Sequence, residues 1–175
     1  MWDENVFNKA MFFALSAHGE QKMKYPSDMP YSAHIMGVTQ SLVACVSQDG
    51  EDIDWNLAVQ VALLHDTIED TKVTYDDILT NFGKVVADGV FAVTKNEELP
   101  KDEQMQDCLN KIVKQPKEIA MVKMADRLFN MRQRPPVWSK QKQDAYKVEA
   151  ELILNTLGYC SKTLKQKLQK SIQNY

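Results

Sequence analysis

Four titratable side chains stand at the polar end of an almost wholly apolar stretch. His65 and Asp66 directly follow the run 57–64, and Glu69 and Asp70 come one helical turn later. On a helix, residues three or four positions apart share a side, so the imidazole and the three carboxylates are expected to converge. Adjacent acids at the end of an apolar helix repel one another and are costly to desolvate unless a cation offsets their charge. The spacing therefore predicts a divalent metal site.

Two ligands are too few to hold a metal ion, so further donors are expected at the ends of other apolar helical segments. His34 in PYSAHIMGV and Asp126 in IAMVKMADRL meet that condition. Taken singly, each is more often an ordinary polar group, but together with His65 and Asp66 they form a candidate ligand set. A mixed nitrogen and oxygen set suits Mn²⁺, Fe²⁺ or Mg²⁺ better than a thiolate site would, although it does not specify the ion.

The order of these residues along the chain resembles the HD phosphohydrolase superfamily, in which such residues hold a divalent metal. More narrowly, the segments PYSAH, ALLHDTIEDT, NFG, VKMADRLFNM and DAYKVEA resemble the hydrolase domain of the RelA/SpoT family, especially the stand-alone small alarmone hydrolases. The similarity runs from about residue 17 to residue 150. Its specific parts are the HDTIEDT and ADRLFN blocks, because an isolated HD pair arises by chance in many proteins.

The resemblance implies an activity and a role for individual residues. The implied reaction removes the 3′-pyrophosphate from guanosine tetra- or pentaphosphate, with Mn²⁺ as the ion. The implied metal ligands are His34, His65, Asp66 and Asp126. The acids implied to handle protons or position water are Glu69 and Asp70. The implied substrate contacts are Lys24, Asn130 and Tyr146.

The leaving group of such a reaction is negatively charged, so cationic side chains are expected to stabilise it. The nearby candidates in the sequence are Lys22, Lys24, Lys123 and Arg127. Lys123 and Arg127 flank Asp126 at minus three and plus one, so only one of them is expected to face the site. Arg127 could instead orient a ligand carboxylate.

Two positions depart from the family pattern. The stand-alone hydrolases usually have Arg-Lys before the proline-containing loop, where this chain has Met23-Lys24, and Lys95 stands where the family has an acid. Met23 offers a soft apolar face but no charge and no fork of donors. A different phosphorylated nucleotide is therefore an alternative substrate. A non-catalytic nucleotide-binding sensor domain is a further alternative, which a missing ligand or acid would favour, and none is missing.

Hydrophobic spacing predicts helices along the whole chain. They are expected at residues 3–22, 32–47, 55–70, 74–82, 85–95, 101–114, 116–131, 140–157 and 161–172. Thr74 and Asp77 form a predicted capping box, and Pro135-Pro136 marks a break. Since no βαβ alternation appears, the predicted fold is all-α, a compact bundle of about eight to ten helices. Residues 1–175 are expected to form a single HD phosphohydrolase domain, as the resemblance implies.

Composition limits the class of protein further. A formal net charge of −3 and a pI near 5.6 argue against a nucleic-acid partner, which calls for a basic face. No apolar run approaches the ~20 residues of a membrane span, and acids occupy the place of a signal peptide's basic region. The expected location is therefore the cytoplasm, with no membrane partner. A bundle of this size could pair through an apolar patch, so a homo-oligomer stays open.

The remaining singled-out residues are expected to be structural. Cys45, Cys108 and Cys160 are odd in number and widely spaced, which favours core thiols over disulfides or a zinc site. His18 is expected to be a cap or surface group because it precedes a glycine near a helix end. The methionines expected to fill the core are Met121, Met124 and Met131.

Overall fold

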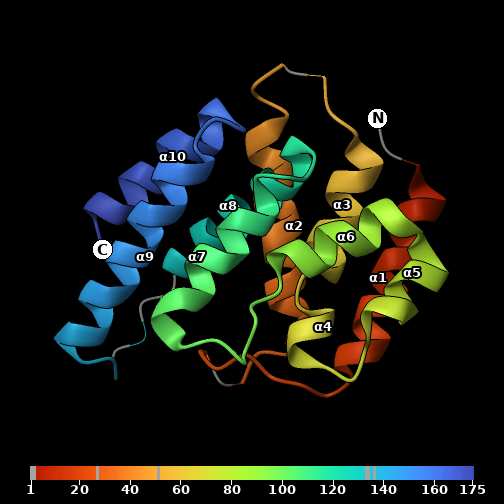
Figure 1. The fold of residues 1–175 in the computed structure, drawn as a ribbon, viewed down its shortest axis with the longest axis horizontal. Helices are drawn as coiled ribbons and strands as arrows, with labels where there is room; N and C mark the ends of the chain where they lie inside the picture. The colour runs from red at the N-terminus through yellow and green to blue at the C-terminus, as the bar shows by residue number, and fades with distance from the viewer. Residues whose placement is uncertain (1–2, 27, 51, 133–134, 136) are drawn as a thin grey trace.

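The computed structural model describes residues 3–26, 28–50, 52–132, 135 and 137–175. Within these residues the chain forms ten α-helices and no strand, which confirms the all-α prediction (Figure 1). The helices are α1 (Glu4–His18), α2 (Ser32–Val46), α3 (Trp55–Leu64), α4 (Thr67–Asp70), α5 (Tyr75–Phe82), α6 (Lys84–Val93), α7 (Lys101–Ile112), α8 (Lys117–Met131), α9 (Lys140–Leu157) and α10 (Lys162–Gln173).

Helices α3 and α8 form the centre of the bundle. Helix α3 packs against α1, α2, α6 and α8, and α8 also packs against α2, α6, α9 and α10. Seven residues of α3 are buried, as expected for a helix that is apolar on nearly every side. The predicted core thiols and core methionines are also buried. His65 and Asp66 directly follow α3, and Asp126 lies within α8. The two central helices of the core therefore fix the positions of three proposed metal ligands.

Gly37 determines how closely α2 approaches α8. A Cβ atom at this position would lie 2.1 Å from the ring of Phe129 on α8, so the ring would have to move away. The missing side chain therefore lets the two helices come into direct contact. This contact brings His34 on α2 next to Asp126 on α8.

The prediction of one continuous helix through the HDTIED segment is wrong. Helix α3 ends at Leu64, and Asp66 has φ −101° and ψ 0°, outside the helical region, before α4 begins at Thr67. Side chains satisfy the carbonyl groups at this break: the Thr67 hydroxyl donates to the Leu64 oxygen at 2.7 Å, and His65 Nδ1 lies 2.8 Å from the Ala62 oxygen. Local side-chain hydrogen bonds of this kind compete with helix continuation.

Two other predictions about helix ends had different outcomes. Helix α1 stops at His18 instead of continuing to residue 22, because Gly19 takes φ +50° and closes the helix with a bond to the Leu15 oxygen. The capping box at Thr74 and Asp77 is confirmed. Of the predicted break at Pro135-Pro136, Pro135 lies between α8 and α9, and Pro136 is outside the described residues.

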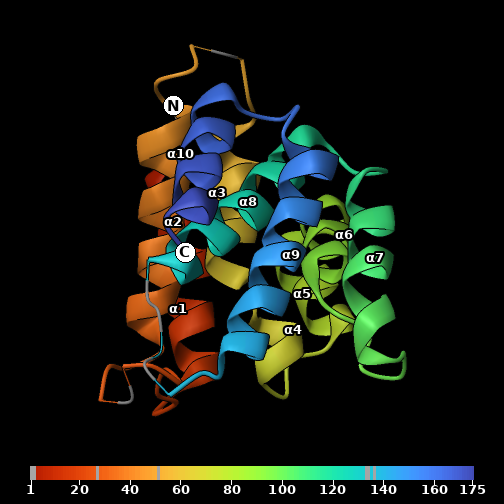
Figure 2. The same cartoon turned by 90° about the vertical axis from the view of Figure 1, so that its left-hand side faces the viewer.

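The loops gather at two opposite ends of the bundle. The loop between α1 and α2, helix α4, the loop after α6 and the start of α9 lie at one end, at the bottom of Figures 1 and 2. The loop between α2 and α3 and the turn between α9 and α10 lie at the other. None of the described helices is long and apolar enough to cross a membrane.

Candidate metal centre and pocket

Four side chains from three regions of the sequence converge at the end of the bundle that carries α4. His34 Nε2 lies 3.2 Å from His65 Nε2 and 3.2 Å from Asp66 Oδ2, and His65 Nε2 lies 3.0 Å from the same oxygen. Asp126 Oδ1 lies 3.6 Å from His34 Nε2 and 4.0 Å from His65 Nε2. The structure thus brings together all four residues for which the sequence predicted a shared metal.

A hydrogen bond from His65 Nδ1 fixes the orientation of the imidazole ring and so the position of Nε2. His65 Nδ1 lies 2.8 Å from the Ala62 carbonyl oxygen, which can only accept, so Nδ1 carries a hydrogen. In the neutral imidazole, Nε2 then presents a lone pair to the centre of the cluster. A backbone carbonyl that fixes the tautomer in this way is typical of metal-binding histidines.

Burial and the neighbouring charges shift the pKa values of the residues in the cluster. Burial alone would lower the pKa of His65, but the Asp66 carboxylate raises this pKa to about 9. Burial would raise the pKa of Asp66, yet the two imidazoles hold it well below its usual range. Without a cation, Asp66 therefore keeps His65 protonated near neutral pH, and a bound cation would displace that proton.

The donor set fits a divalent metal. Two neighbouring ligands of an octahedral cation at about 2.1 Å from it lie about 3.0 Å apart. The donor atoms of His34, His65 and Asp66 are separated by 3.0 to 3.2 Å, close to this value. Lys123 does not take the place of the ion, because its Nζ lies 3.8 Å from Asp126 Oδ2 and not beside Oδ1, the oxygen that faces the imidazoles.

Asn130 and Lys123 hold Asp126 in place. Asn130 Nδ2 donates to Asp126 Oδ1 at 2.6 Å, one turn along α8. Lys123 is buried, donates to the Val93 oxygen at 3.3 Å and faces Asp126. Burial would lower the pKa of Lys123, but Cys108, Asp126 and Glu69 raise it, so its charge is kept. Asn130, expected to contact substrate, therefore also orients a candidate ligand.

Glu69 and Asp70 lie beside the cluster in different surroundings. Glu69 is half-buried and accepts a hydrogen bond from the Lys95 backbone N–H at 3.0 Å. Burial raises the pKa of Glu69, which suits an acid that must hold or release a proton closer to neutral pH. Asp70 Oδ2 lies 2.8 Å from the Tyr31 hydroxyl oxygen, at hydrogen-bond distance. The convergence predicted for the HDTIED segment holds, although α4 and not a continuous helix produces it.

A cavity of about 320 Å³ opens over these residues, within the range of small-molecule sites. All the predicted site residues line it except His65, which lies beneath Asp66. Lys22 and Lys24 reach it from the loop between α1 and α2. Both Lys123 and Arg127 line it, so the expectation that only one of them faces the site is wrong.

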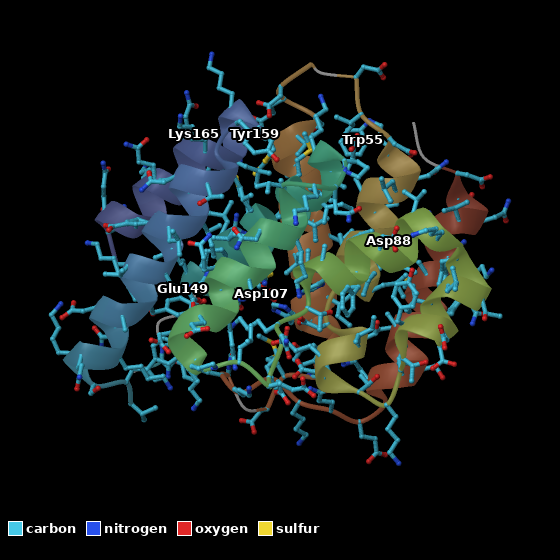
Figure 3. The ribbon with its side chains drawn as sticks, viewed as in Figure 1. Trp55, Asp88, Asp107, Glu149, Tyr159 and Lys165 are labelled. Atoms are coloured by element: carbon cyan, nitrogen blue, oxygen red, sulfur yellow. The ribbon has the colours of Figure 1, made fainter. Side chains whose placement is uncertain are left out.

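Arg127 and Tyr146 form one wall of the cavity. The Arg127 guanidinium lies 4.1 Å from the centre of the Tyr146 ring and is ion-paired with Glu149. Figure 3 shows Glu149 on α9, beside its neighbours α7 and α8. Trp138 packs edge-on against the Tyr146 ring, with 5.1 Å between ring centres. Arg127 is thus tied to Glu149 and does not orient a candidate ligand carboxylate.

Two residues that line the cavity, Tyr31 and Lys95, and His18 behind Tyr31 were missed or misjudged from the sequence. Tyr31 donates to Asp66 Oδ2 at 2.5 Å, and the only sequence signal was its position three residues before His34. His18 is buried and stacks on Tyr31 with ring centres 4.6 Å apart, so the expectation of a surface group is wrong. Lys95, noted only as a departure from the family pattern, lines the cavity.

Comparison with known proteins decides the family. Residues 10–158 match the family described as HD domain, and every predicted site residue lies within that range. The chain belongs to the HD domain family. This HD domain is 34% identical to guanosine-3′,5′-bis(diphosphate) 3′-pyrophosphohydrolase MESH1 of Danio rerio, over 94% of the chain and 91% of that relative.

More distant relatives of this HD domain agree. A protein of Aquifex aeolicus named guanosine-3′,5′-bis(diphosphate) 3′-pyrophosphohydrolase is 33% identical over 82% of this chain, which spans 19% of that longer protein. A solved structure, described as a metazoan ortholog of SpoT that hydrolyzes ppGpp, superposes with a TM-score of 0.84 at 26% identity, over 99% of this chain and 97% of the other. The predicted family is confirmed.

Proposed function

We propose that this protein is a metal-dependent phosphohydrolase that removes the 3′-pyrophosphate of a guanosine 3′,5′-bis(diphosphate)-type alarmone. The observation that carries the proposal is the convergence of His34, His65, Asp66 and Asp126 under a cavity lined by lysines. The names of its MESH1 relatives, and of the structure that superposes on it, support this substrate.

The metal we propose is Mn²⁺, held by the two imidazoles and the two aspartates. When bound, such a cation supplies Lewis acidity and makes water a usable nucleophile near neutral pH. Glu69, whose pKa is raised by burial, is the group we assign to moving the proton of that water. Asp70 is assigned to orienting the water.

The cavity wall supplies the positive charge that a substrate with two diphosphate groups needs. Lys22 and Lys24 approach from one loop and Lys95 from another, and no acid of the described residues forms an ion pair with any of the three. These three ammonium groups are therefore free to meet phosphate oxygens. The rings of Tyr146 and Trp138 also line the cavity and add apolar surface for the base to its wall.

Product analysis tests this proposal. The purified protein is stripped with a chelator, reloaded with Mn²⁺ and given guanosine 3′,5′-bis(diphosphate). We expect guanosine 5′-diphosphate and inorganic pyrophosphate in equal amounts, and no turnover by Asp66→Ala. Binding without turnover under every divalent metal would indicate a sensor domain and overturn the proposal.

A second substrate class is favoured by one observation. Met23 is buried at the cavity wall, where it offers no charge. A panel of 3′- and 5′-phosphorylated nucleotides separates the two candidates: faster release of phosphate or pyrophosphate from another member would identify a different phosphorylated nucleotide as the substrate. We also propose that residues 1–175 form one HD domain that acts in the cytoplasm, where such nucleotides are found.

A further inference from the structure

The Tyr31 hydroxyl lies between the two carboxylates that the proposed function uses in different ways. It is 2.5 Å from Asp66 Oδ2 and 2.8 Å from Asp70 Oδ2. Asp66 Oδ2 is also the oxygen that faces both imidazoles, at 3.2 and 3.0 Å. One phenolic oxygen therefore contacts both a candidate metal ligand and a candidate catalytic acid.

A hydroxyl group carries a single hydrogen, so Tyr31 can donate to only one carboxylate at a time. Both carboxylates nevertheless lie at hydrogen-bond distance from it, and the positions of both are defined relative to this one oxygen. Moving the tyrosine would displace both at once. Asp66 is the N-cap of α4 and Asp70 is its last residue, so the Tyr31 hydroxyl contacts one residue at each end of this short helix.

Backbone hydrogen bonds and two neighbouring rings hold the rest of Tyr31. Its backbone N–H donates to the Gln21 oxygen at 2.8 Å, and its carbonyl accepts from His34 N–H at 2.9 Å. The His18 ring covers one face of the Tyr31 ring, with 4.6 Å between centres and 20° between planes. The His34 ring lies 5.2 Å away on the side of the metal centre. The ring is therefore held between the His18 and His34 rings, and its remaining side faces the cavity.

We propose that Tyr31 is a positioning residue that holds Asp66 for metal binding and Asp70 for catalysis, and that His18 keeps the Tyr31 ring in place. The part concerning Asp70 rests on the proposed function. The part concerning Asp66 needs only metal binding, so the two can fail separately. Partners that orient metal-binding carboxylates typically contribute 10- to 100-fold in metal affinity or activity.

Tyr31→Phe is the direct test, because it removes the hydroxyl and keeps the ring. We expect Mn²⁺ affinity, measured by equilibrium dialysis without substrate, to fall by about tenfold or more. We expect kcat at saturating Mn²⁺ to fall by a similar factor while KM changes less than about twofold, since Tyr31 positions an acid and does not bind the nucleotide. A metal affinity and a kcat both within twofold of wild type would overturn the proposal.

Tyr75→Phe is the matched control. The Tyr75 hydroxyl donates to Asp88 at 2.7 Å, a tyrosine–aspartate hydrogen bond of the same kind, and neither residue lines the cavity. Figure 3 shows Asp88 on α6. We expect this variant to keep the wild-type metal affinity and kcat. An equal loss of metal affinity in Tyr75→Phe would show a general effect on the fold and overturn the assignment to Tyr31.

His18 is tested by a pair of substitutions that separates its ring from its hydrogen bond. His18→Phe and His18→Ala both remove the 2.8 Å contact between Nδ1 and Gln21, but only the first keeps an aromatic face against Tyr31. We expect His18→Ala to weaken Mn²⁺ binding severalfold and His18→Phe to change it less than twofold. If the alanine variant binds Mn²⁺ like wild type, the support from His18 is refuted.

Two outcomes separate this inference from the proposed function. Should the wild-type protein bind Mn²⁺ but hydrolyse no alarmone, the proposed substrate fails while the dialysis of Tyr31→Phe still tests the hold on Asp66. Should Tyr31→Phe fail to fold, as judged by circular dichroism, the His18 pair measured by dialysis decides the same point.

Discussion

Asp66 and Asp49 lie at opposite ends of the same bundle and are satisfied in opposite ways. Asp49, in the loop between α2 and α3, accepts hydrogen bonds from the Ser161 hydroxyl and from the Thr163 backbone and hydroxyl at the start of α10. Asp66 faces two imidazole nitrogens, and its one hydroxyl donor is shared with Asp70. Figures 1 and 2 show the two ends, with the loop before α3 at the top and α4 at the bottom.

The difference shows what each carboxylate is for. Donors supplied by the protein complete the hydrogen bonds of Asp49, so its contribution is to stability: it joins a loop to the positive end of α10. Asp66 contacts one hydroxyl and Asp126 one amide, and the other close neighbours of their oxygens are imidazole nitrogens, which also bind metals. Half-buried acids gathered around two imidazoles form a site arranged for a cation to bind.

The largest expected effect comes from removing a metal ligand. His65→Ala or Asp66→Ala should lower kcat/KM by at least about a thousandfold, since several kcal/mol of transition-state stabilisation are lost with the cation. Mn²⁺ should raise the unfolding temperature of the wild type by mass action and leave that of Asp66→Ala unchanged. Asp76→Ala, an exposed acid on α5, is the control. Retained activity in Asp66→Ala would remove the contrast with Asp49.

Glu69→Gln should lower kcat by about a hundredfold or more with little change in metal affinity, because general acid–base catalysis typically contributes 10² to 10⁴. The amide oxygen of glutamine can still accept from Lys95 N–H, so the loop after α6 should keep its place. Steady-state kinetics and Mn²⁺ dialysis provide the two measurements. Glu97→Gln, an exposed acid in the same loop, should behave like wild type, and an active Glu69→Gln would contradict the assigned role.

Asp49→Ala should do the reverse: it should lower the free energy of unfolding by about 1 to 2 kcal/mol and leave kcat unchanged. The reason is that Thr163 N–H, at the start of α10, loses its acceptor far from the cavity. Urea unfolding and steady-state kinetics would measure the two effects. Asp52→Ala, an exposed neighbour in the same loop, should change stability by less than about 0.5 kcal/mol. A large loss of activity in Asp49→Ala would mean that the two ends are not independent.

The smallest expected effect is a pH dependence of stability with opposite signs at the two ends, in chelated protein. Burial alone would raise the pKa of Asp49, but hydrogen bonds from Ser161 and Thr163 lower it. Ionised Asp49 therefore stabilises the fold fully above its unfolded pKa of about 4, and this stabilisation is lost as the pH falls below that value. Burial raises the pKa of Glu69, so its ionised form destabilises the fold above that raised pKa, and the penalty disappears as pH falls through it.

The measurement compares two amide variants in urea at several pH values. At pH near 7, Asp49→Asn should be less stable than wild type and Glu69→Gln more stable, and both differences should shrink in acid. The Glu69 difference should begin to shrink at the higher pH. If Glu69→Gln proves less stable than wild type at neutral pH, then Glu69 contributes to the fold as Asp49 does.

Much of the site could be predicted from the sequence because its residues lie in or directly after apolar helical segments. His65 and Asp66 directly follow α3, which has seven buried residues, and polar residues beside a buried helix must either be satisfied or serve a ligand. The backbone geometry at His65 and Asp66 could not be predicted in this way. The break between α3 and α4 depends on which side chains take the carbonyls of Ala62 and Leu64, and helical spacing alone does not show this.

The sequence by itself determined the residue types and their order: two imidazoles and two carboxylates on separate apolar segments, the acids one turn beyond them, and an all-helical pattern. Only the tertiary structure decided how they meet. Gly37 lets α2 reach α8, Tyr31 comes between Asp66 and Asp70, and His18 turns inward to cover it. The physical reason is that hydrophobic periodicity fixes which face of a helix is buried, whereas contacts between helices distant in sequence depend on close packing in three dimensions.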